Sequence, residues 1–258
     1  MILQKTTDLN YIPKRIISLV PSQTELLHYF KLEKEAIGIT KFCVHPKKWF
    51  QTKTRIGGTK NITIKKIKEL QPDLIIANKE ENVQEQVEQL ALDYPVWVTD
   101  VNNLDDALSM ITDLGLLTGK TDIALSLTKQ IKINFDAITP ANIPLKTAYL
   151  IWQKPYMTVG GDTFINDMLL KAGFNNIYAN KKRYPEVTME DLQVANCQLL
   201  LLSSEPYPFK QKHINELQVH LPNTKIILAD GEFFSWYGSR LLQAPSYFKQ
   251  LISEIQPR

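Results

Sequence analysis

Short apolar runs alternate with helix-period patterns along most of the chain. Runs rich in β-branched and aliphatic residues predict strands at 16–20, 37–40, 73–78, 95–99, 148–152, 199–202 and 225–229. Apolar residues at helical spacing predict helices at 22–30, 63–70, 81–92, 163–172, 189–195, 209–219 and 240–255. Strands that are apolar throughout are typical of parallel sheets covered by helices on both faces. The pattern therefore predicts an α/β protein.

Several predicted helices begin or end at residues with capping chemistry. Ser22-x-x-Glu25 has the form of a capping box at the first helix. Asp162 and Thr188 are expected to cap the helices at 163–172 and 189–195. Gly173 is expected to close the first of these two helices, because glycine readily adopts the left-handed conformation found there.

The alternation is interrupted once, between residues 103 and 137, where two helical patterns follow one another. The segment TPANIP at 139–144 then marks a boundary, beyond which the strand-first pattern resumes. We therefore predict an N-terminal α/β lobe over 1–116, a bridging helix and linker over 117–144, and a C-terminal α/β lobe over 145–258.

Composition places the chain among ordinary globular proteins. It has 258 residues, of which 44% are hydrophobic and 22% charged. Thirty basic and 27 acidic residues give a net charge of +3, which offers no argument for a nucleic-acid partner. No apolar run reaches the roughly 18 residues that a membrane span needs. The N-terminus lacks a leader-peptide pattern, so a cytoplasmic location is expected as the sequence is read, and a periplasmic one if a leader has been removed.

Most site chemistries leave no pattern in this sequence. The four histidines are not accompanied by the converging ligands that zinc requires, and Cys43 and Cys197 are far apart. Neither a Gly-x-Gly-x-x-Gly motif nor a Gly-x-Ser-x-Gly elbow occurs. We therefore predict no catalytic residues, no protein-bound metal and no intrinsic cofactor.

Loops at the carboxyl ends of the predicted strands hold many aromatic and polar residues. Open α/β sheets bind ligands at this end of the strands. The segment GEFFSWYGSR at 231–240 has four aromatic residues and ends in a cation. Its three polar residues and two glycines favour a ligand-facing loop over a buried strand, and flat side chains around a few polar groups suit a bulky ligand.

The order of the motifs resembles a known family. RIISLVPSQTELLHYF, GITKFCVHP, IGGTKNITIKKIKELQPDLIIAN and VWVTD are followed by TVGGDTFINDMLLKAGFNNI and LADGEFFSWYGSRLL. This order is similar to that of the helical-backbone (class III) solute-binding proteins of ABC importers, and most similar to their periplasmic cobalamin-binding and ferric-siderophore-binding branch. The resemblance implies two Rossmann-like lobes with central parallel sheets, one long bridging helix and a ligand cleft between the lobes.

By position, the resemblance also implies a set of ligand-binding residues. Those of the first lobe are Ser22, Gln23, Phe42, Cys43, Thr59, Asn78 and Lys79. Those of the second lobe are Trp152, Gln153, Tyr184, Ser204, Trp236 and Arg240. A helix N-terminus and Arg240 would suit anionic groups, whereas Trp152 and Trp236 would suit the face of a macrocycle.

The resemblance implies non-catalytic binding of a metal chelate, with a corrinoid first and a ferric siderophore or haem second. The alternatives are a cytoplasmic sensing or interaction module and an enzyme built on the same frame, with His45, Glu80, Glu205 and Asp230 as its only candidate titrating groups. A monomer is expected. Importer docking in the family uses one surface glutamate on each lobe. Here the first aligns with Lys65, and no acidic residue lies between Glu232 and Glu254.

Overall fold

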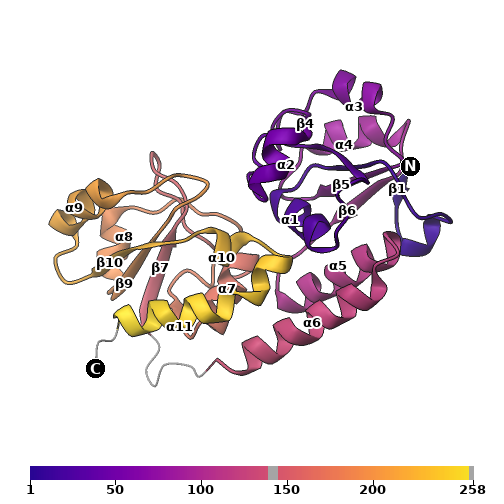
Figure 1. Cartoon of the computed structure of the whole chain (residues 1–258). Helices are drawn as coiled ribbons and strands as arrows, with labels where there is room; N and C mark the ends of the chain where they lie inside the picture. Colours follow the sequence, from indigo (N-terminus) through magenta and orange to yellow (C-terminus); the bar gives the residue numbers. More distant parts are fainter. Residues whose placement is uncertain (139–144, 256–258) are drawn as a thin grey trace. The chain divides into compact units, whose positions relative to one another are not determined.

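The chain folds into two compact units, each built on its own parallel sheet (Figure 1). The structure is a computed structural model and describes residues 1–138 and 145–255. The first unit comprises Met1–Val101, Asp105–Ile131 and Tyr237–Arg240, and the second comprises Asn102–Leu104, Lys132–Trp236 and Leu241–Arg258. The predicted α/β class with two separate parallel sheets is confirmed.

The first unit has a six-stranded sheet in the order β1-β6-β5-β2-β3-β4, and every strand pair is parallel. Its strands are β1 (Ile2–Leu3), β2 (Ile16–Ser18), β3 (Ala36–Ile39), β4 (Thr54–Arg55), β5 (Leu74–Asn78) and β6 (Val96–Thr99). Its helices are α1 (Pro21–Tyr29), α2 (Lys47–Thr52), α3 (Ile64–Leu70), α4 (Gln84–Ala91) and α5 (Leu104–Leu117), with the turn η1 (Thr6–Asp8) near the N-terminus. Because β5 is buried along its whole length, helices cover both of its faces.

The second unit has a four-stranded parallel sheet in the order β10-β9-β7-β8. Its strands are β7 (Lys146–Leu150), β8 (Asn175–Asn176), β9 (Leu199–Ser203) and β10 (Lys225–Ala229). Its helices are α7 (Phe164–Lys171), α8 (Met189–Val194), α9 (Gln211–His220), α10 (Glu232–Ser235) and α11 (Ala244–Ile255). Leu200 and Leu202 of β9 lie in a core that also contains Ala148, Leu150 and Leu217.

Helix α6 (Thr121–Asp136) and the short turn η2 (Ser239–Leu242) each have residues in both units, as does α5 through its first residue, Leu104. Helix α6 falls within the predicted bridging segment, and the boundary between the units divides it at Ile131 and Lys132. The predicted linker at 139–144 lies outside the described residues. No helix in the described part of the chain is long and apolar enough to cross a bilayer.

Two of the predicted helix caps are wrong, and the physical reason is visible in each case. Helix α1 begins at Pro21 with Val20 as its N-cap, because proline suits the first helical position. The carboxylate of Glu25, which a capping box would need, instead binds Arg240. At α7 the cap is the Thr163 hydroxyl, which accepts a hydrogen bond from the Asn166 N–H at 3.2 Å.

Asp162, the cap predicted from the sequence, lies one residue before the actual N-cap, Thr163. Its carboxylate accepts a hydrogen bond from the Arg183 N–H at 2.6 Å. Two other predicted helix ends are confirmed. Thr188 forms a capping box with Asp191 at the start of α8, and Gly173 follows α7 with a φ of +85°.

The Thr163 cap predicts a measurable contribution to the stability of the second unit. Thr163→Ala should lower the free energy of unfolding by about 1–2 kcal/mol, because it leaves the Asn166 N–H without its acceptor. Urea unfolding measures this loss. Asp162→Ala is the matched control and should cost less, since Asp162 accepts no hydrogen bond from the first turn of α7. A larger loss of unfolding free energy in Asp162→Ala than in Thr163→Ala would contradict the assignment of Thr163 as the N-cap.

Candidate functional site

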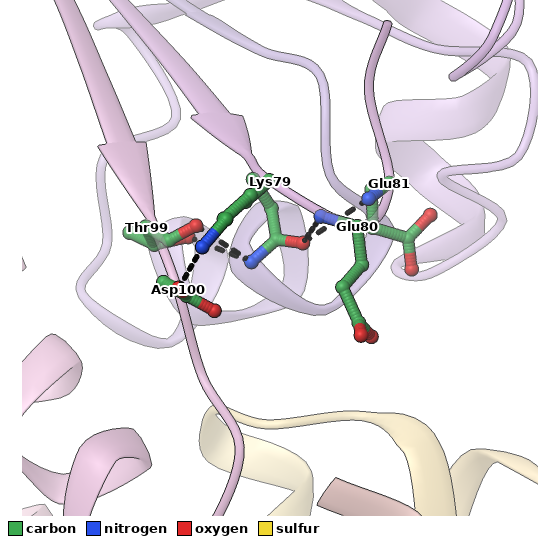
Figure 2. A network of polar contacts seen from close by, with 6 residues as sticks. Lys79, Glu80, Glu81, Thr99 and Asp100 are labelled. Atoms are coloured by element: carbon green, nitrogen blue, oxygen red, sulfur yellow. Dashed lines mark hydrogen bonds and ion pairs between the residues drawn. The ribbon is translucent and has the colours of Figure 1, made fainter. Parts of the chain in front are cut away.

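The carboxyl ends of β5 and β6 carry a polar network in the first unit (Figure 2). The Asn78 amide nitrogen donates to the carbonyl oxygen of Thr99 at 3.0 Å and to its hydroxyl at 3.1 Å. The Asn78 side-chain oxygen accepts from the backbone N–H groups of Glu80 and Glu81 at 2.9 and 3.1 Å. Both polar ends of this buried amide are therefore used, and the turn after β5 is tied to the end of β6.

Gln23 joins this network from the first turn of α1. Its side-chain nitrogen donates to the Thr99 hydroxyl at 2.6 Å, and that hydroxyl donates to the Ala77 carbonyl at 3.1 Å. Gln23 is fully buried, and its side-chain oxygen has no hydrogen-bond partner among the described residues. Such an acceptor is costly to leave unsatisfied, but this oxygen exposes less than 1 Å² of surface and therefore lies beneath the molecular surface.

Lys79 extends from the same turn and forms an ion pair with Asp100, with 2.7 Å between the ammonium nitrogen and the carboxylate oxygen (Figure 2). Both side chains are largely exposed, so the pair adds little to stability. The ion pair matters for the charge of the candidate site. The positive charge of Lys79, one of the predicted site residues, is compensated by the adjacent carboxylate.

The loop after β3 separates two neighbouring predicted site residues. The Phe42 ring is 50% exposed, with the Lys41 ammonium 5.1 Å from its centroid. Cys43 is fully buried, and its sulfur lies 3.1 Å from the Thr24 hydroxyl and 3.2 Å from the Thr40 hydroxyl. Burial raises the pKa of the Cys43 thiol. Cys43 therefore anchors the loop, and Phe42 is the residue that the loop exposes.

Asn82 is a member of the network that sequence reasoning missed. Its side-chain oxygen accepts from the Asn78 N–H at 2.9 Å, and its nitrogen donates to the carbonyl oxygens of Leu19 and Thr59 at 3.3 and 3.0 Å. It thereby joins the ends of β2 and β5 to the predicted site residue Thr59. Ser22, another predicted site residue, is 5% exposed in the first turn of α1.

In the second unit, aromatic and amide side chains gather after β7. Trp152 is 41% exposed and packs edge-on against Tyr207, with 5.7 Å between the ring centroids. The Gln153 side-chain oxygen accepts from the Tyr207 hydroxyl at 2.7 Å, and its nitrogen donates to the Tyr156 hydroxyl at 3.2 Å. Trp152 and Gln153, which are both predicted site residues, therefore contact the same aromatic side chain, Tyr207.

Glu205 organises the neighbouring strand end and is absent from the predicted binding residues. One of its carboxylate oxygens accepts from the Ser235 hydroxyl at 2.6 Å and from the Trp236 indole N–H at 2.8 Å. Burial raises the pKa of Glu205, and the nearby charges of Glu232 and Asp230 add to the rise, whereas the two hydrogen bonds oppose it.

The raised pKa of Glu205 predicts a pH dependence of stability. Between the ordinary glutamate pKa and the raised value, the folded state holds a proton that the unfolded state has released. The free energy of unfolding therefore falls as pH rises through this window, and below it Glu205 contributes no slope. We expect Glu205→Gln to remove the part of this decrease in unfolding free energy that comes from the Glu205 carboxyl.

Melting temperatures between about pH 4 and pH 8 test this expectation. Glu216→Gln, at an exposed position on α9, is the control and should keep the wild-type slope. Equal slopes in wild type and Glu205→Gln would contradict the role of the Glu205 carboxyl.

The remaining predicted residues of the C-terminal half have different surroundings. The Ser204 hydroxyl accepts from the Gly231 N–H at 2.9 Å. Tyr184 is half-buried, with the Arg183 guanidinium 5.8 Å from its ring. Trp236 is only 5% exposed, so it contributes to packing in addition to its bond with Glu205.

Arg240 belongs to the first unit and binds a carboxylate there. Its Nη2 and Nε atoms lie 2.7 and 3.2 Å from the two carboxylate oxygens of Glu25. The two side chains are 13% and 20% exposed. A two-pronged pair of this kind fixes both groups and compensates the charge of the guanidinium.

The aromatic-rich segment at 231–240 differs from the expected ligand-facing loop. Part of it forms α10, and Phe234 on that helix is fully buried. Its ring lies 5.2 Å from that of Tyr149 and 4.8 Å from that of Phe248, measured between centroids. At least one of the four aromatic residues, Phe234, therefore packs in the core of the second unit. The spacing of aromatic residues along so short a helix does not indicate this burial.

The candidate enzyme groups are divided between the two units. Glu80 lies in the network of the first unit, whereas Glu205 and Asp230 lie at strand ends of the second. Among the described residues, no three histidine, cysteine or acidic side chains are placed to hold a metal ion. What both units offer is a set of amide, hydroxyl and aromatic groups at strand ends, which is suited to binding.

Two α/β units with such strand ends define a solute-binding class of protein, and the comparisons identify the family. The pattern of the periplasmic binding protein family matches residues 16–221. The chain belongs to this family, whose members bind solutes and are not enzymes.

Individual relatives are distant in sequence but cover nearly the whole chain. The vitamin B12-binding protein of Yersinia pestis (strain Pestoides F) is 23% identical over 250 residues, which are 94% of this chain and 87% of the relative. The solved structure of the periplasmic vitamin B12 binding protein BtuF of Vibrio cholerae has a TM-score of 0.75 at 20% identity, covering 95% of this chain and 99% of that one. The periplasmic heme binding protein HutB of Vibrio cholerae has a TM-score of 0.79 at 18% identity, covering 92% and 98%. At these identities, the similarity to the two solved structures shows only that the fold is shared.

Proposed function

We propose that this protein binds a metal chelate without transforming it, and that its preferred ligand is a corrinoid. The binding group would be the aromatic group around Trp152 in the second unit, with Gln153 and Tyr207 beside it. The observation that carries the proposal is the Trp152 ring, which is 41% exposed and held edge-on against Tyr207. The broad face of a corrin ring can pack against such an exposed indole.

The charge of the candidate residues supports a corrinoid over haem. Haem carries two carboxylates and would be favoured by cations that are free to bind them. Both cations among the predicted site residues are already compensated, Lys79 by Asp100 and Arg240 by Glu25. The names of the curated relatives, vitamin B12-binding proteins, agree with this preference.

Delivery of the ligand is the second part of the proposal. A solute-binding protein of this family would pass its ligand to the membrane components of an ABC-type importer, acting as a monomer. Such a role requires the protein to meet its ligand outside the cytoplasm. Cell fractionation followed by N-terminal sequencing tests this part, and recovery of the protein in the cytoplasmic fraction alone would contradict it.

Calorimetric titration with cyanocobalamin, hemin and a ferric hydroxamate siderophore tests the choice of ligand. We expect cyanocobalamin to bind with a Kd of about 1 μM or tighter, and more tightly than the other two. Tighter binding of hemin or of the siderophore would overturn the corrinoid preference. Affinities no tighter than about 1 mM for all three would overturn the proposal as a whole.

A further inference from the structure

The charge of the chain is very unevenly distributed along the sequence. Nine of the 30 basic residues, and none of the 27 acidic ones, lie within residues 36–68. The rest of the chain therefore has 21 basic and 27 acidic residues, a net charge of −6. The modest net charge of the whole protein conceals a strongly basic segment, and such a segment creates a local positive potential.

The fold brings this segment to one part of the first unit. It includes α2, the edge strand β4 and α3 (Figure 1). Arg55 of β4 donates a hydrogen bond to the Phe50 carbonyl of α2 at 2.6 Å. Lys66 of α3 donates to the Arg55 carbonyl at 3.4 Å. These contacts make the three elements neighbours. Their exposed cations are named the basic face here: Lys47, Lys48, Arg55, Lys65, Lys66 and Lys68.

Most of the positive charge of the basic face is not compensated by acidic side chains. Lys48 pairs with Glu33 and Lys68 with Asp93, each at 2.7 Å, and both pairs are exposed to solvent. The other four cations have no ion pair with any acidic residue in the described part of the chain. Glu69 is the one acidic residue within α3. A partner with many negative charges would therefore gain attraction over the whole face.

The chemistry of the basic face narrows the kind of partner. Protein interfaces rely on exposed apolar anchors and are depleted in lysine. Phe42 and Val44 are exposed in the loop before α2, but no large apolar side chain within α2, β4 or α3 is exposed, and Trp49 of α2 is fully buried. Five of the six cations are lysines, whereas recognition of nucleic-acid bases relies on arginine and on exposed aromatic rings. Mobile ammonium groups without an apolar centre suit a diffuse anionic surface.

We propose that the basic face holds the protein against the anionic headgroups of a lipid bilayer. Each lysine or arginine near such a surface strengthens the partition onto it by about fivefold. The attraction is a property of the first unit alone and does not depend on the identity of the ligand or on whether a ligand binds.

Sedimentation with lipid vesicles tests the proposal. The intact protein is mixed with vesicles of phosphatidylcholine alone, or with about one third phosphatidylglycerol, at low salt. We expect it to pellet only with the anionic vesicles and to be released by about 0.5 M NaCl. The variant Lys47→Gln/Lys65→Gln/Lys66→Gln should partition about a hundredfold more weakly, because three cations are lost. The matched control, Lys171→Gln/Lys212→Gln/Lys249→Gln, removes three exposed lysines from helices of the second unit and should behave as wild type.

The following results would overturn the proposal. The first is equal pelleting with neutral and anionic vesicles, and the second is no pelleting with either at low salt. The third is equal loss of partition in the two triple variants, which would indicate net charge and not the basic face. Tighter binding to a short DNA duplex than to anionic vesicles at the same salt would assign the face to nucleic acid. Equal melting temperatures of the variants confirm that all of them are folded.

Discussion

Trp152→Ala is expected to weaken cyanocobalamin binding by about thirtyfold or more, which corresponds to the 2 kcal/mol typical of an aromatic anchor. The expectation follows from the placement of the ring. Trp152 is 41% exposed, and its edge-on contact with Tyr207 holds the indole in position without burying it. Because the exposed surface of the ring packs against nothing in the described chain, its loss should change the melting temperature by only about two degrees.

The control for this experiment is Tyr29→Ala. Tyr29 is 39% exposed on α1 and is not among the candidate binding residues, so its removal should leave the affinity unchanged. Calorimetry measures the affinity, and differential scanning calorimetry measures the melting temperature. An unchanged affinity in Trp152→Ala would remove Trp152 from the proposed site. A loss of affinity accompanied by a large fall in melting temperature would indicate that Trp152 acts through folding.

Phe234→Ala should have the opposite signature, a large loss of stability. Phe234 is fully buried against Tyr149 and Phe248, so removing the ring leaves a cavity as well as losing apolar contact. Substitutions of this kind lower the free energy of unfolding by about 3–5 kcal/mol. Denaturant titration followed by circular dichroism measures the change.

Phe233→Ala is the matched control in the same helix. Phe233 is half-buried and stacks on Tyr247, with 4.5 Å between ring centroids and 17° between the ring planes. Its loss should cost about 1 kcal/mol, because less apolar surface leaves the core. Equal losses in Phe233→Ala and Phe234→Ala would contradict the assignment of Phe234 to the core of the second unit.

The strands of the two sheets could be predicted from the sequence wherever they are long and buried. Strands β5, β9 and β10 have five residues each, and the first two are buried throughout, so their apolar runs stand out. Strands β1, β4 and β8 have two residues each and leave no such run. Helix α2, with the sequence KKWFQT, buries only Trp49 and has too few turns for a periodic pattern.

The polar connections of the candidate site could be predicted less well. Spacing along the chain indicates that Asn78 ends a strand, but not that its amide binds Thr99, which follows 21 residues later. The capping box expected at Ser22 and Glu25 fails for the same reason. Glu25 pairs with Arg240, 215 residues away, and no local pattern indicates that contact. Side chains at strand ends meet partners that the fold supplies, so they are apparent only in three dimensions.

The burial of the aromatic residues after β10 could also not be predicted from the local sequence. Polar residues and glycines within residues 231–240 favoured a loop, yet Phe234 and Trp236 are buried. Helix α10 has only four residues, so its buried face consists of a single turn. The decisive packing partners are Tyr149 and Phe248, which belong to distant segments of the chain.

Gel filtration after incubation with cyanocobalamin tests the central claim, corrinoid binding, most directly. The corrin ring absorbs visible light, so the protein peak reports bound ligand without any label. We predict that the protein peak carries the corrin absorbance in a one-to-one ratio, and that the Trp152→Ala protein carries much less. A protein peak without visible absorbance, at concentrations well above about 1 μM, would contradict the claim.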